Sequence, residues 1–426
     1  MPDAITQPGN GESSTPAATV DVVIGVLTYN SADYAADVIR DAEHSLTACF
    51  PGRRGVIVHA DGGSKDGTQE HAAAAAKDKD AFVQIAYTIY PAQKIYPEWI
   101  GVPGKANGVQ AVFAAAQARE ARACIIVDAT VGRPAEGAIA NLLRPVLEKE
   151  MDFVAPCYIR HKYDGAILNG IVYPFIRALY SRRVHQPIGG DYAVSGKLLR
   201  HLMSQVWPDG DSTSWDADAW AIVHSFSGGF RIAEAALGPR HIRPHDPSPE
   251  TSSILAQALG SLFIEMNRSA GFWQRTRASQ AVPGFGPHFD PPADPAPVDP
   301  APMAQSFRLG YQNLLDIYRM ILPPATLLEL KRMSLQGADE MRFDDMLWAR
   351  VIYDFALAWR TRSLDRAHLL GALTPLYLGW AASWVRSLRD AGPAEVEERI
   401  EALCSAYESQ KGYLISRWRW PDRFNP

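Results

Sequence analysis

Val20-Asp21-Val22-Val23-Ile24-Gly25-Val26-Leu27, followed at once by Thr28-Tyr29-Asn30, is a nearly continuous apolar run that ends in polar residues. Apolar runs of this length that contain β-branched residues are typical of a parallel strand covered on both faces. An open α/β sheet binds its ligands at the carboxyl ends of such strands. Thr28, Tyr29 and Asn30 are therefore candidate binding residues.

Further segments of the same character follow along the chain. We expect strands at 55–60, 82–87 and 123–127, with a possible fifth at 153–155. Helix-like segments lie between them, as in the spacing of Tyr34, Val38, Ala42 and Leu46 on one helical face. This alternation predicts an open α/β sheet with helices packed against it.

The second half of the chain has a different pattern. The segment 283–302 contains eight prolines and is expected to be a linker or an extended strap. After it, 307–413 shows helical spacing without a convincing strand, for example at Leu314, Ile317, Tyr318 and Ile321. We predict a disordered tail at 1–18, an α/β domain at 19–275, a linker at 276–305 and a helical domain at 306–426.

Composition excludes several classes of protein. With 47% hydrophobic and 21% charged residues and a formal net charge of -5, the chain resembles a soluble globular protein and not a nucleic-acid binder. Four cysteines lie far apart without metal-site spacing, which suits reduced thiols in the cytoplasm: Cys49, Cys124, Cys157 and Cys404. The first residues lack the features of a secretory signal. The uncharged stretch 369–385 is shorter than the roughly 20 residues of a membrane span, so we expect a buried helix and turn there.

The loop after the second predicted strand reads Asp61-Gly62-Gly63-Ser64-Lys65-Asp66-Gly67-Thr68. Its glycines allow a tight turn, and Asp66 or Thr68 is suited to cap the next helix. The loop resembles the D-G-S-x-D-G-T signature of GT-A glycosyltransferases, which implies that Asp61 holds the base or ribose of a nucleotide. The alternative is a plain strand-to-helix turn.

Two further loops carry charge. In Pro103-Gly104-Lys105-Ala106-Asn107-Gly108, a lysine at the start of a helix can meet a diphosphate, although a solvated lysine is the simpler alternative. The strand at 123–127 leads into Asp128-Ala129-Thr130, where GT-A enzymes carry an Asp-x-Asp that binds a divalent cation. Asp128 alone can still take Mg²⁺ or Mn²⁺, or it binds ribose or caps a turn.

Two later motifs are more selective. Gln186-Pro187-Ile188-Gly189-Gly190-Asp191 lets the backbone approach a ligand closely and places an acid beside it, although an ordinary turn with a solvated Asp has the same composition. Trp215-Asp216-Ala217-Asp218 follows one helix later. Together with the earlier loops, the motif order over 20–247 is similar to mannosylglycerate synthase and, more loosely, to glucosyl-3-phosphoglycerate synthase. Both are retaining GT-A glycosyltransferases.

This resemblance implies roles for individual residues. Asp61 and Lys105 would bind the nucleotide, Asp128 the metal and diphosphate, and Gly189 and Gly190 the donor sugar. Asp191 and Asp218 would lie beside the reacting sugar as the candidate catalytic acids. His241 matches a late metal-ligand histidine, with His245 as a competitor for that role. Same-face attack assisted by the leaving phosphate is favoured over a covalent intermediate on either acid.

The resemblance also implies the acceptor. Arg160 and Asp164 match an R-x-x-x-D pair that binds a small anion such as glycerate or 3-phosphoglycerate. Where a hydroxyl residue is expected next, this chain has Leu168 and Asn169, so the acceptor can differ. GDP-mannose and UDP-glucose are both compatible donors. A homodimer is expected only because symmetric dimers are common.

Three other classes stay open. A nucleotidyltransferase would carry a basic glycine-rich loop after the first strand, where this chain has Thr28-Tyr29-Asn30. A GT-A-like binding protein that has lost catalysis is supported by Thr130. An interaction or membrane-surface protein would use the tryptophans of the helical part, which more often fill a core: Trp380, Trp384, Trp418 and Trp420.

Overall fold

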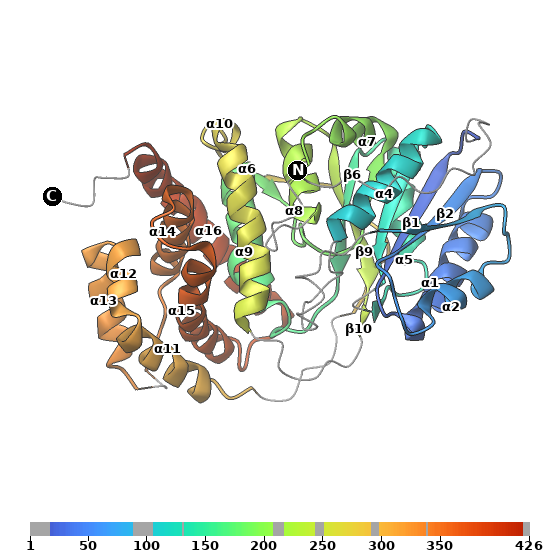
Figure 1. Ribbon diagram of the computed structural model, residues 1–426. Coiled ribbons are helices and arrows are strands. Elements are labelled where there is room, and N and C mark those ends of the chain that lie inside the picture. Colours follow the sequence, from blue (N-terminus) through green and yellow to red (C-terminus); the bar gives the residue numbers. More distant parts are fainter. Residues whose placement is uncertain are drawn as a thin grey trace, which may run out of the picture.

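The computed structural model describes residues 18–87, 105–129, 132–207, 217–242, 251–290, 298–337 and 340–420. An α/β domain and a helical domain lie side by side, with the long helix α9 (Thr251–Arg268) between them (Figure 1). The expected fold class, an α/β domain followed by a helical domain, is confirmed.

The α/β domain is built on an eight-stranded sheet in the order β12-β9-β6-β8-β4-β1-β2-β3. Neighbouring strands run parallel except β8, which is antiparallel to both β4 and β6. Its strands are β1 (Val22–Thr28), β2 (Gly55–Asp61), β3 (Phe82–Ala86), β4 (Ala123–Asp128), β6 (Phe153–Tyr158), β8 (Tyr192–Ser195), β9 (Ile232–Gly238) and β12 (Gly284–Phe285). All five strands expected from the sequence are present, and the mixed sheet fits the GT-A fold that the sequence resembles.

The sheet divides the apolar residues of β1 between two cores. Alternate side chains point to opposite faces, so Val22, Ile24 and Val26 join one cluster and Val23 and Leu27 the other. The first face is covered by α1 (Ala32–His44), α2 (Thr68–Ala75) and α5 (Ala138–Lys149). The second is covered by α4 (Lys105–Ala118), α7 (Gly196–Met203) and α8 (Ala217–Ser227). Because the second cluster continues into the helical domain, that domain packs on one side of the sheet only.

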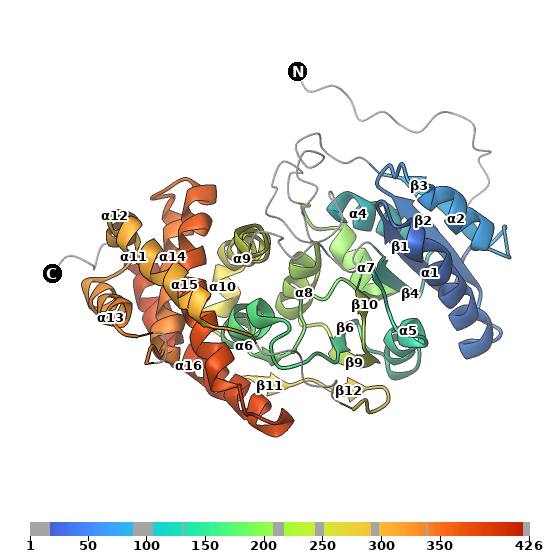
Figure 2. The same cartoon turned by 90° about the horizontal axis from the view of Figure 1, so that it is seen from below.

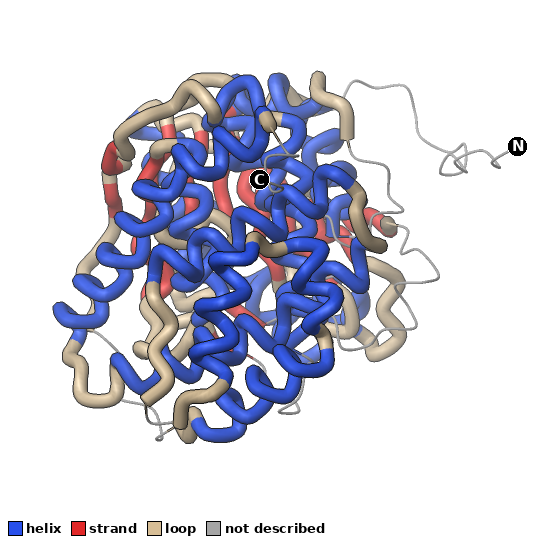
Figure 3. The backbone as a smooth tube through the Cα atoms, turned by 90° about the vertical axis from the view of Figure 1, so that its left-hand side faces the viewer, coloured by secondary structure: helices blue, strands red, loops and turns tan. Residues whose placement is uncertain are grey.

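The helical domain consists of α11 (Ala301–Asn313), α12 (Leu315–Ile321), α13 (Pro324–Ser334), α14 (Asp345–Thr361), α15 (Arg366–Ser387) and α16 (Pro393–Arg419). In Figure 3 these helices lie in front of the sheet. The stretch 369–385 is part of one continuous helix through Pro375, so the turn expected there was wrong. Among the described residues, no helix is long and apolar enough to cross a membrane.

A short segment of the α/β domain forms hydrogen bonds and ion pairs with the helical domain. It comprises the π-helical turn η2 (Leu168–Val172) and α6 (Tyr173–Tyr180). The carbonyl of Gly170 accepts hydrogen bonds from Trp348 Nε1 at 2.9 Å and from Tyr407 OH at 3.1 Å. The buried Arg177 forms ion pairs with Glu401 and Glu408 on α16. The two domains therefore share a hydrogen-bonded core.

The chain between the domains follows the edge of the sheet. β11 (Gln280–Ala281) pairs with β7 (Arg182–Arg183), and β12 lies beside β9, as seen from below in Figure 2. The first part of the proline-rich stretch is thus an extended strap held against the α/β domain. Residues 1–17 of the expected disordered tail and the prolines of 291–297 lie outside the described residues, and the domain limits stay a prediction.

Candidate functional site

The carboxyl ends of three neighbouring strands bring the predicted loops together. Thr28 at the end of β1 is in register with Asp61 at the end of β2, and Leu27 is in register with Asp128 at the end of β4. The three loops that follow these strands therefore open at the same edge of the sheet, where an α/β fold binds its ligands.

Asp61 organises the loop that follows it. Its Oδ2 accepts hydrogen bonds from Thr28 Oγ1 at 2.8 Å and Ser64 Oγ at 2.6 Å, and its Oδ1 accepts from the Gly63 and Ser64 N–H groups and from Gln69 Nε2. Burial by itself would raise the pKa of Asp61, but the hydrogen bonds from Ser64, Thr28 and Gln69 outweigh it and lower the pKa. The carboxylate anchors the turn, and its contact with a base or ribose stays a prediction.

Asn30 fastens the first loop to the second. It adopts a positive φ of 49°, donates from its N–H to Ser64 Oγ at 2.8 Å, and accepts from the Lys65 N–H at 3.1 Å. Tyr29 is half-buried against the apolar core. The N-cap of α2 is Gly67, which has no capping side chain, so the cap expected of Asp66 or Thr68 was wrong; Asp66 instead accepts the N–H of Thr68, the first residue of the helix.

Lys105 is the first residue of α4 and reaches two acids from different parts of the chain. Its Nζ lies 2.8 Å from Asp218 Oδ2 and 3.5 Å from Asp128 Oδ2, and it donates to the Gly190 carbonyl at 3.4 Å. The side chains of Asp218 and Asp128 are only 2% and 4% exposed. Lys105, which we expect to bind a diphosphate, therefore lies beside Asp128, expected at the metal, and Asp218, expected at the sugar.

The Gly189-Gly190 turn lies against these groups. Gly190 has a φ of 87°, and its N–H donates to Asp218 Oδ2 at 2.9 Å. A Cβ at Gly190 would lie 3.2 Å from Arg240 Nη1 and 3.4 Å from Asp128 Cβ. Glycine is needed at this position for its conformation, and an added Cβ would also come unusually close to Arg240 Nη1.

Asp191 faces the interior beneath this turn. Its Oδ1 accepts the Asp128 N–H at 2.7 Å, while its Oδ2 accepts from Tyr158 OH and from Arg240 Nη1, the latter at 2.9 Å. Burial raises the pKa of Asp191, and the charge of Arg240 opposes that rise. The carboxylate is enclosed and holds the end of β4, and its place beside the donor sugar stays a prediction.

Arg240 is a central residue that the sequence analysis did not select. Besides Asp191, it donates to the carbonyls of Gly189 and Asp128, and its guanidinium lies 5.3 Å from the centre of the Tyr158 ring. It thereby ties the strand β4 to the glycine turn. The only signal in the sequence was its place beside His241, which does not distinguish a buried arginine from an exposed one.

The metal ligands that the resemblance implies are only partly described. His241 begins β10 (His241–Ile242) and pairs with Arg133 of β5 (Gly132–Arg133), but its side chain, His245 and Thr130 lie outside the described atoms. Within the described part of the chain, no group of three or more His, Cys, Asp or Glu side chains is arranged to hold a metal ion. Among the described residues, Asp128 and Asp218, whose carboxylates both contact Lys105, are the best candidates for metal ligands.

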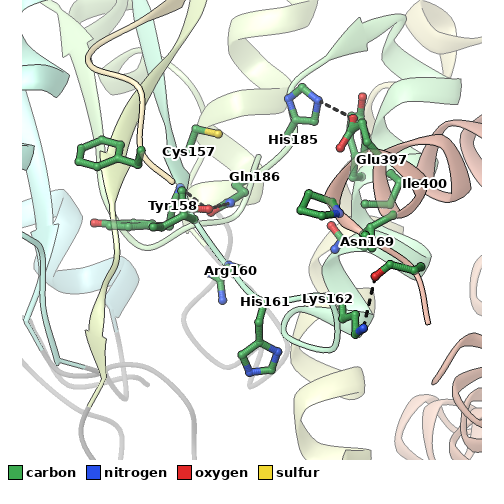
Figure 4. A pocket seen from close by; sticks show the side chains of 17 residues that line it. Cys157, Tyr158, Arg160, His161, Lys162, Asn169, His185, Gln186, Glu397 and Ile400 are labelled. Atoms are coloured by element: carbon green, nitrogen blue, oxygen red, sulfur yellow. Dashed lines mark hydrogen bonds and ion pairs between the residues drawn. The ribbon is translucent and has the colours of Figure 1, made fainter. Parts of the chain in front are cut away.

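A cavity of about 330 Å³ lies where β6 and η2 meet the start of α16. Arg160, Asn169 and Gln186 line it from the α/β domain, and Glu397 and Ile400 line it from α16 (Figure 4). Gln186 is held in place, since its amide exchanges hydrogen bonds with the N–H and carbonyl of Tyr158. Both domains therefore contribute to the cavity wall.

Of the predicted acceptor pair, Arg160 lines the cavity and Asp164 does not. Among the described residues, Asp164 Oδ1 lies 3.1 Å from His161 Nε2 and forms no ion pair with Arg160. Burial lowers the pKa of Arg160, and the charge of Asp164 partly opposes this. Arg160 Nε is buried without a hydrogen-bond partner among the described residues. A buried arginine donor of this kind is suited to a carboxylate or phosphate oxygen.

His185 bridges the two domains at the cavity. Its Nδ1 lies 3.0 Å from Glu234 Oε2 on β9, and its Nε2 lies 3.8 Å from Glu397 Oε1 on α16. Burial alone would lower the pKa of His185, but the hydrogen bond to Glu234 and the nearby carboxylate of Glu397 outweigh it and raise the pKa to about 10. The sequence contained no signal for this bridge, because its three members come from distant segments.

Comparison with known proteins gives a limited likeness. No protein-family model and no curated protein matches the chain. The glucosyl-3-phosphoglycerate synthase of Mycobacterium tuberculosis in complex with phosphoglyceric acid is similar at 20% identity and a TM-score of 0.43, over 59% of this chain and 80% of that chain. A structure of that synthase with Mn²⁺, UDP-glucose and glycerol 3-phosphate gives 19% identity and a TM-score of 0.42 over the same shares. Likeness of this degree does not place the chain in a family.

Proposed function

We propose that this protein is a retaining glycosyltransferase that moves a hexose from a nucleotide-diphosphate sugar, GDP-mannose or UDP-glucose, to a small anionic acceptor such as glycerate or 3-phosphoglycerate. The observation that carries the proposal is the convergence of Lys105, Asp128 and Asp218 on the Gly190 turn at the carboxyl ends of the strands. A cation, two buried carboxylates and an open backbone turn are the parts that cleavage of a sugar-diphosphate bond requires.

The donor would lie across the loops that follow β1, β2 and β4. The Asp61 loop, fastened by Thr28 and Asn30, would receive the nucleoside, because its conformation is fixed before any ligand arrives. Lys105 and the N–H groups at the start of α4 would face the diphosphate. Negative charge that develops on the leaving group is then stabilised by groups already in place.

The sugar would lie against the Gly189-Gly190 turn. Positive charge that develops on the sugar would be met by Asp218, whose Oδ2 is held by the Gly190 N–H and by Lys105. Asp191 would act as a positioning residue through Asp128 and Arg240, since its carboxylate is enclosed. A same-face attack in which the leaving phosphate accepts the acceptor's proton is favoured, because both oxygens of Asp191 and Oδ2 of Asp218 already accept hydrogen bonds within the protein.

The acceptor would bind in the cavity between β6 and α16. Its volume of about 330 Å³ lies at the lower end of the range for small-molecule pockets, roughly 300–1,000 Å³. Arg160 would bind the acceptor's carboxylate or phosphate, and Asn169 would select among its hydroxyl groups. Tyr158 connects this cavity to the donor side, because it lines the cavity and donates to Asp191.

A divalent cation would be held by Asp128 and Asp218, with His241 as a further ligand, and when bound it would neutralise charge on the diphosphate. Two carboxylates satisfy the protein's share of a Mg²⁺ or Mn²⁺ site when phosphate oxygens and waters complete it. The chemistry of the described oxygens therefore fits such an ion.

Thermal shift with GDP, UDP, GDP-mannose and UDP-glucose, each with and without Mn²⁺, tests the donor half of the proposal, since a ligand that binds only the folded state raises its stability. We expect one base to raise the melting temperature, and Asp128→Asn to abolish the metal-dependent part. Release of nucleoside diphosphate with glycerate or 3-phosphoglycerate then tests transfer. Binding without release would favour a GT-A-like protein that binds nucleotide sugars without turnover, and the absence of any shift would refute the proposal.

A further inference from the structure

The ammonium of Lys105 occupies the space between the two described carboxylates that a divalent cation would use. Its distances to Asp218 Oδ2 and Asp128 Oδ2 are 2.8 and 3.5 Å. All three side chains are largely enclosed, with Lys105 12% exposed. Charges this far from solvent are costly unless an opposite charge lies beside them. Lys105, with the buried Arg240 nearby, therefore supplies positive charge that offsets the two acids.

The position of Lys105 is defined by its helix. It is the first residue of α4, and its Nζ also donates to the Gly190 carbonyl. The same Asp218 Oδ2 accepts from the lysine and from the Gly190 N–H. A metal ion that bound this oxygen would have to displace the ammonium, because two cations cannot both approach one buried carboxylate oxygen without strong mutual repulsion.

We infer that Lys105 is a resident cation that competes with a divalent metal ion for Asp128 and Asp218, so that metal enters only after the ammonium has left Asp218. A divalent ion held by the same two carboxylates would lie within a few ångströms of the ammonium, and two cations repel each other most strongly where solvent is excluded.

A diphosphate changes this balance. This step rests on the proposed function. The negative charge of the diphosphate would give the ammonium a new partner and leave the carboxylates to the metal. Metal and nucleotide would then increase each other's affinity, because coupling between two ligands is reciprocal. Lys105 would make metal binding conditional on the presence of a donor.

The test measures Mn²⁺ binding to the full chain by the electron paramagnetic resonance signal of the free ion, without any nucleotide. Lys105→Met is expected to bind Mn²⁺ at least about tenfold more tightly than the unaltered protein, within the usual range of coupling between sites. Lys149→Met is the matched control, because it removes the same charge from an exposed position in the last turn of α5. Adding Asp128→Asn to Lys105→Met should cancel the gain.

Equal Mn²⁺ affinity in Lys105→Met and the unaltered protein would overturn the inference, as would an equal gain in Lys149→Met. If Lys105→Met does not fold, Lys105→Gln keeps a polar group of similar length and replaces it in the same titration. The proposed function fails separately, when neither GDP nor UDP binds under any condition. A gain in Mn²⁺ affinity with no nucleotide binding would uphold the competition and refute the transferase.

Discussion

Arg240 Nη1 donates to Asp191 Oδ2 over 2.9 Å, and the two side chains are only 6% and 1% exposed. This buried ion pair joins the strand end at Asp128 to the glycine turn, since Asp191 holds the Asp128 N–H and Arg240 holds the Gly189 carbonyl. The geometry of the candidate donor site therefore depends on a pair that need not touch the donor.

Arg240→Met is expected to lower the free energy of unfolding by about 3–5 kcal/mol, because removing one partner leaves a buried charge uncompensated. Adding Asp191→Asn should restore part of that loss, since the unpaired charge is then absent. Urea unfolding followed by circular dichroism measures both. Arg319→Met is the control, because its ion pair with Asp316 is exposed and is worth less than about 1 kcal/mol. Similar losses at Arg240 and Arg319 would contradict a buried anchor.

Gly190→Ala is expected to abolish donor binding and turnover. Its positive φ of 87° strains any other residue, and the new Cβ would lie 3.2 Å from Arg240 Nη1, closer than an ordinary contact. Gly229→Ala separates the two effects, because Gly229 has a φ of 70° with no atom within 4 Å of the added Cβ. Both variants should lose about 1–2 kcal/mol of stability. Calorimetric titration with the nucleotide sugar should show lost binding in Gly190→Ala alone, and retained binding there would contradict a role of the turn in holding the donor sugar.

His185 predicts a pH-dependent contact between the domains. Its pKa is raised from 6.5 to about 10, so its contribution to stability is complete below about pH 6.5 and is lost as the pH rises through about 10. The difference in melting temperature between the unaltered protein and His185→Gln should therefore be largest near pH 6.5 and disappear above about pH 10. His368→Gln is the control, because that side chain is 83% exposed. A difference that does not change with pH would show that the imidazole acts by packing alone.

Arg160→Met is expected to raise the KM for the anionic acceptor by about tenfold or more while donor affinity stays unchanged, because charged hydrogen bonds contribute about 1.5–3 kcal/mol. Arg160→Lys should restore little, since a lysine lacks the planar guanidinium. Initial rates at varied acceptor concentration, with donor binding measured separately, check this. An equal loss of donor and acceptor binding would place Arg160 outside the acceptor site.

Local sequence patterns predicted the elements well. The strand at 22–28, the Asp61 loop and the position of Lys105 at the start of a helix depend on apolar spacing and turn-forming residues within short segments. Such preferences act over a few neighbouring residues, so they can be recognised without knowing the rest of the fold. The same reasoning was wrong at Pro375, where the chain continues as a helix. There, packing of the buried helix outweighs the local cost of a proline.

The candidate site was predicted less completely. Motif order brought Asp128, Gly190 and Asp218 to one place, but it did not show that Lys105 pairs with Asp218 across 113 residues. Nor did it show that Arg240, rather than solvent or a sugar, meets the carboxylate of Asp191. Whether an acid points toward a ligand or into the interior depends on which segments pack beside it.

Local periodicity therefore predicted five of the eight strands, the helical character of the second half and the loops that end at one edge of the sheet. The partners of the buried charges and the cavity shared with α16 depend on how distant segments pack together. A buried charge takes whichever opposite charge the packed chain brings within a few ångströms, and that neighbour comes from a distant part of the sequence.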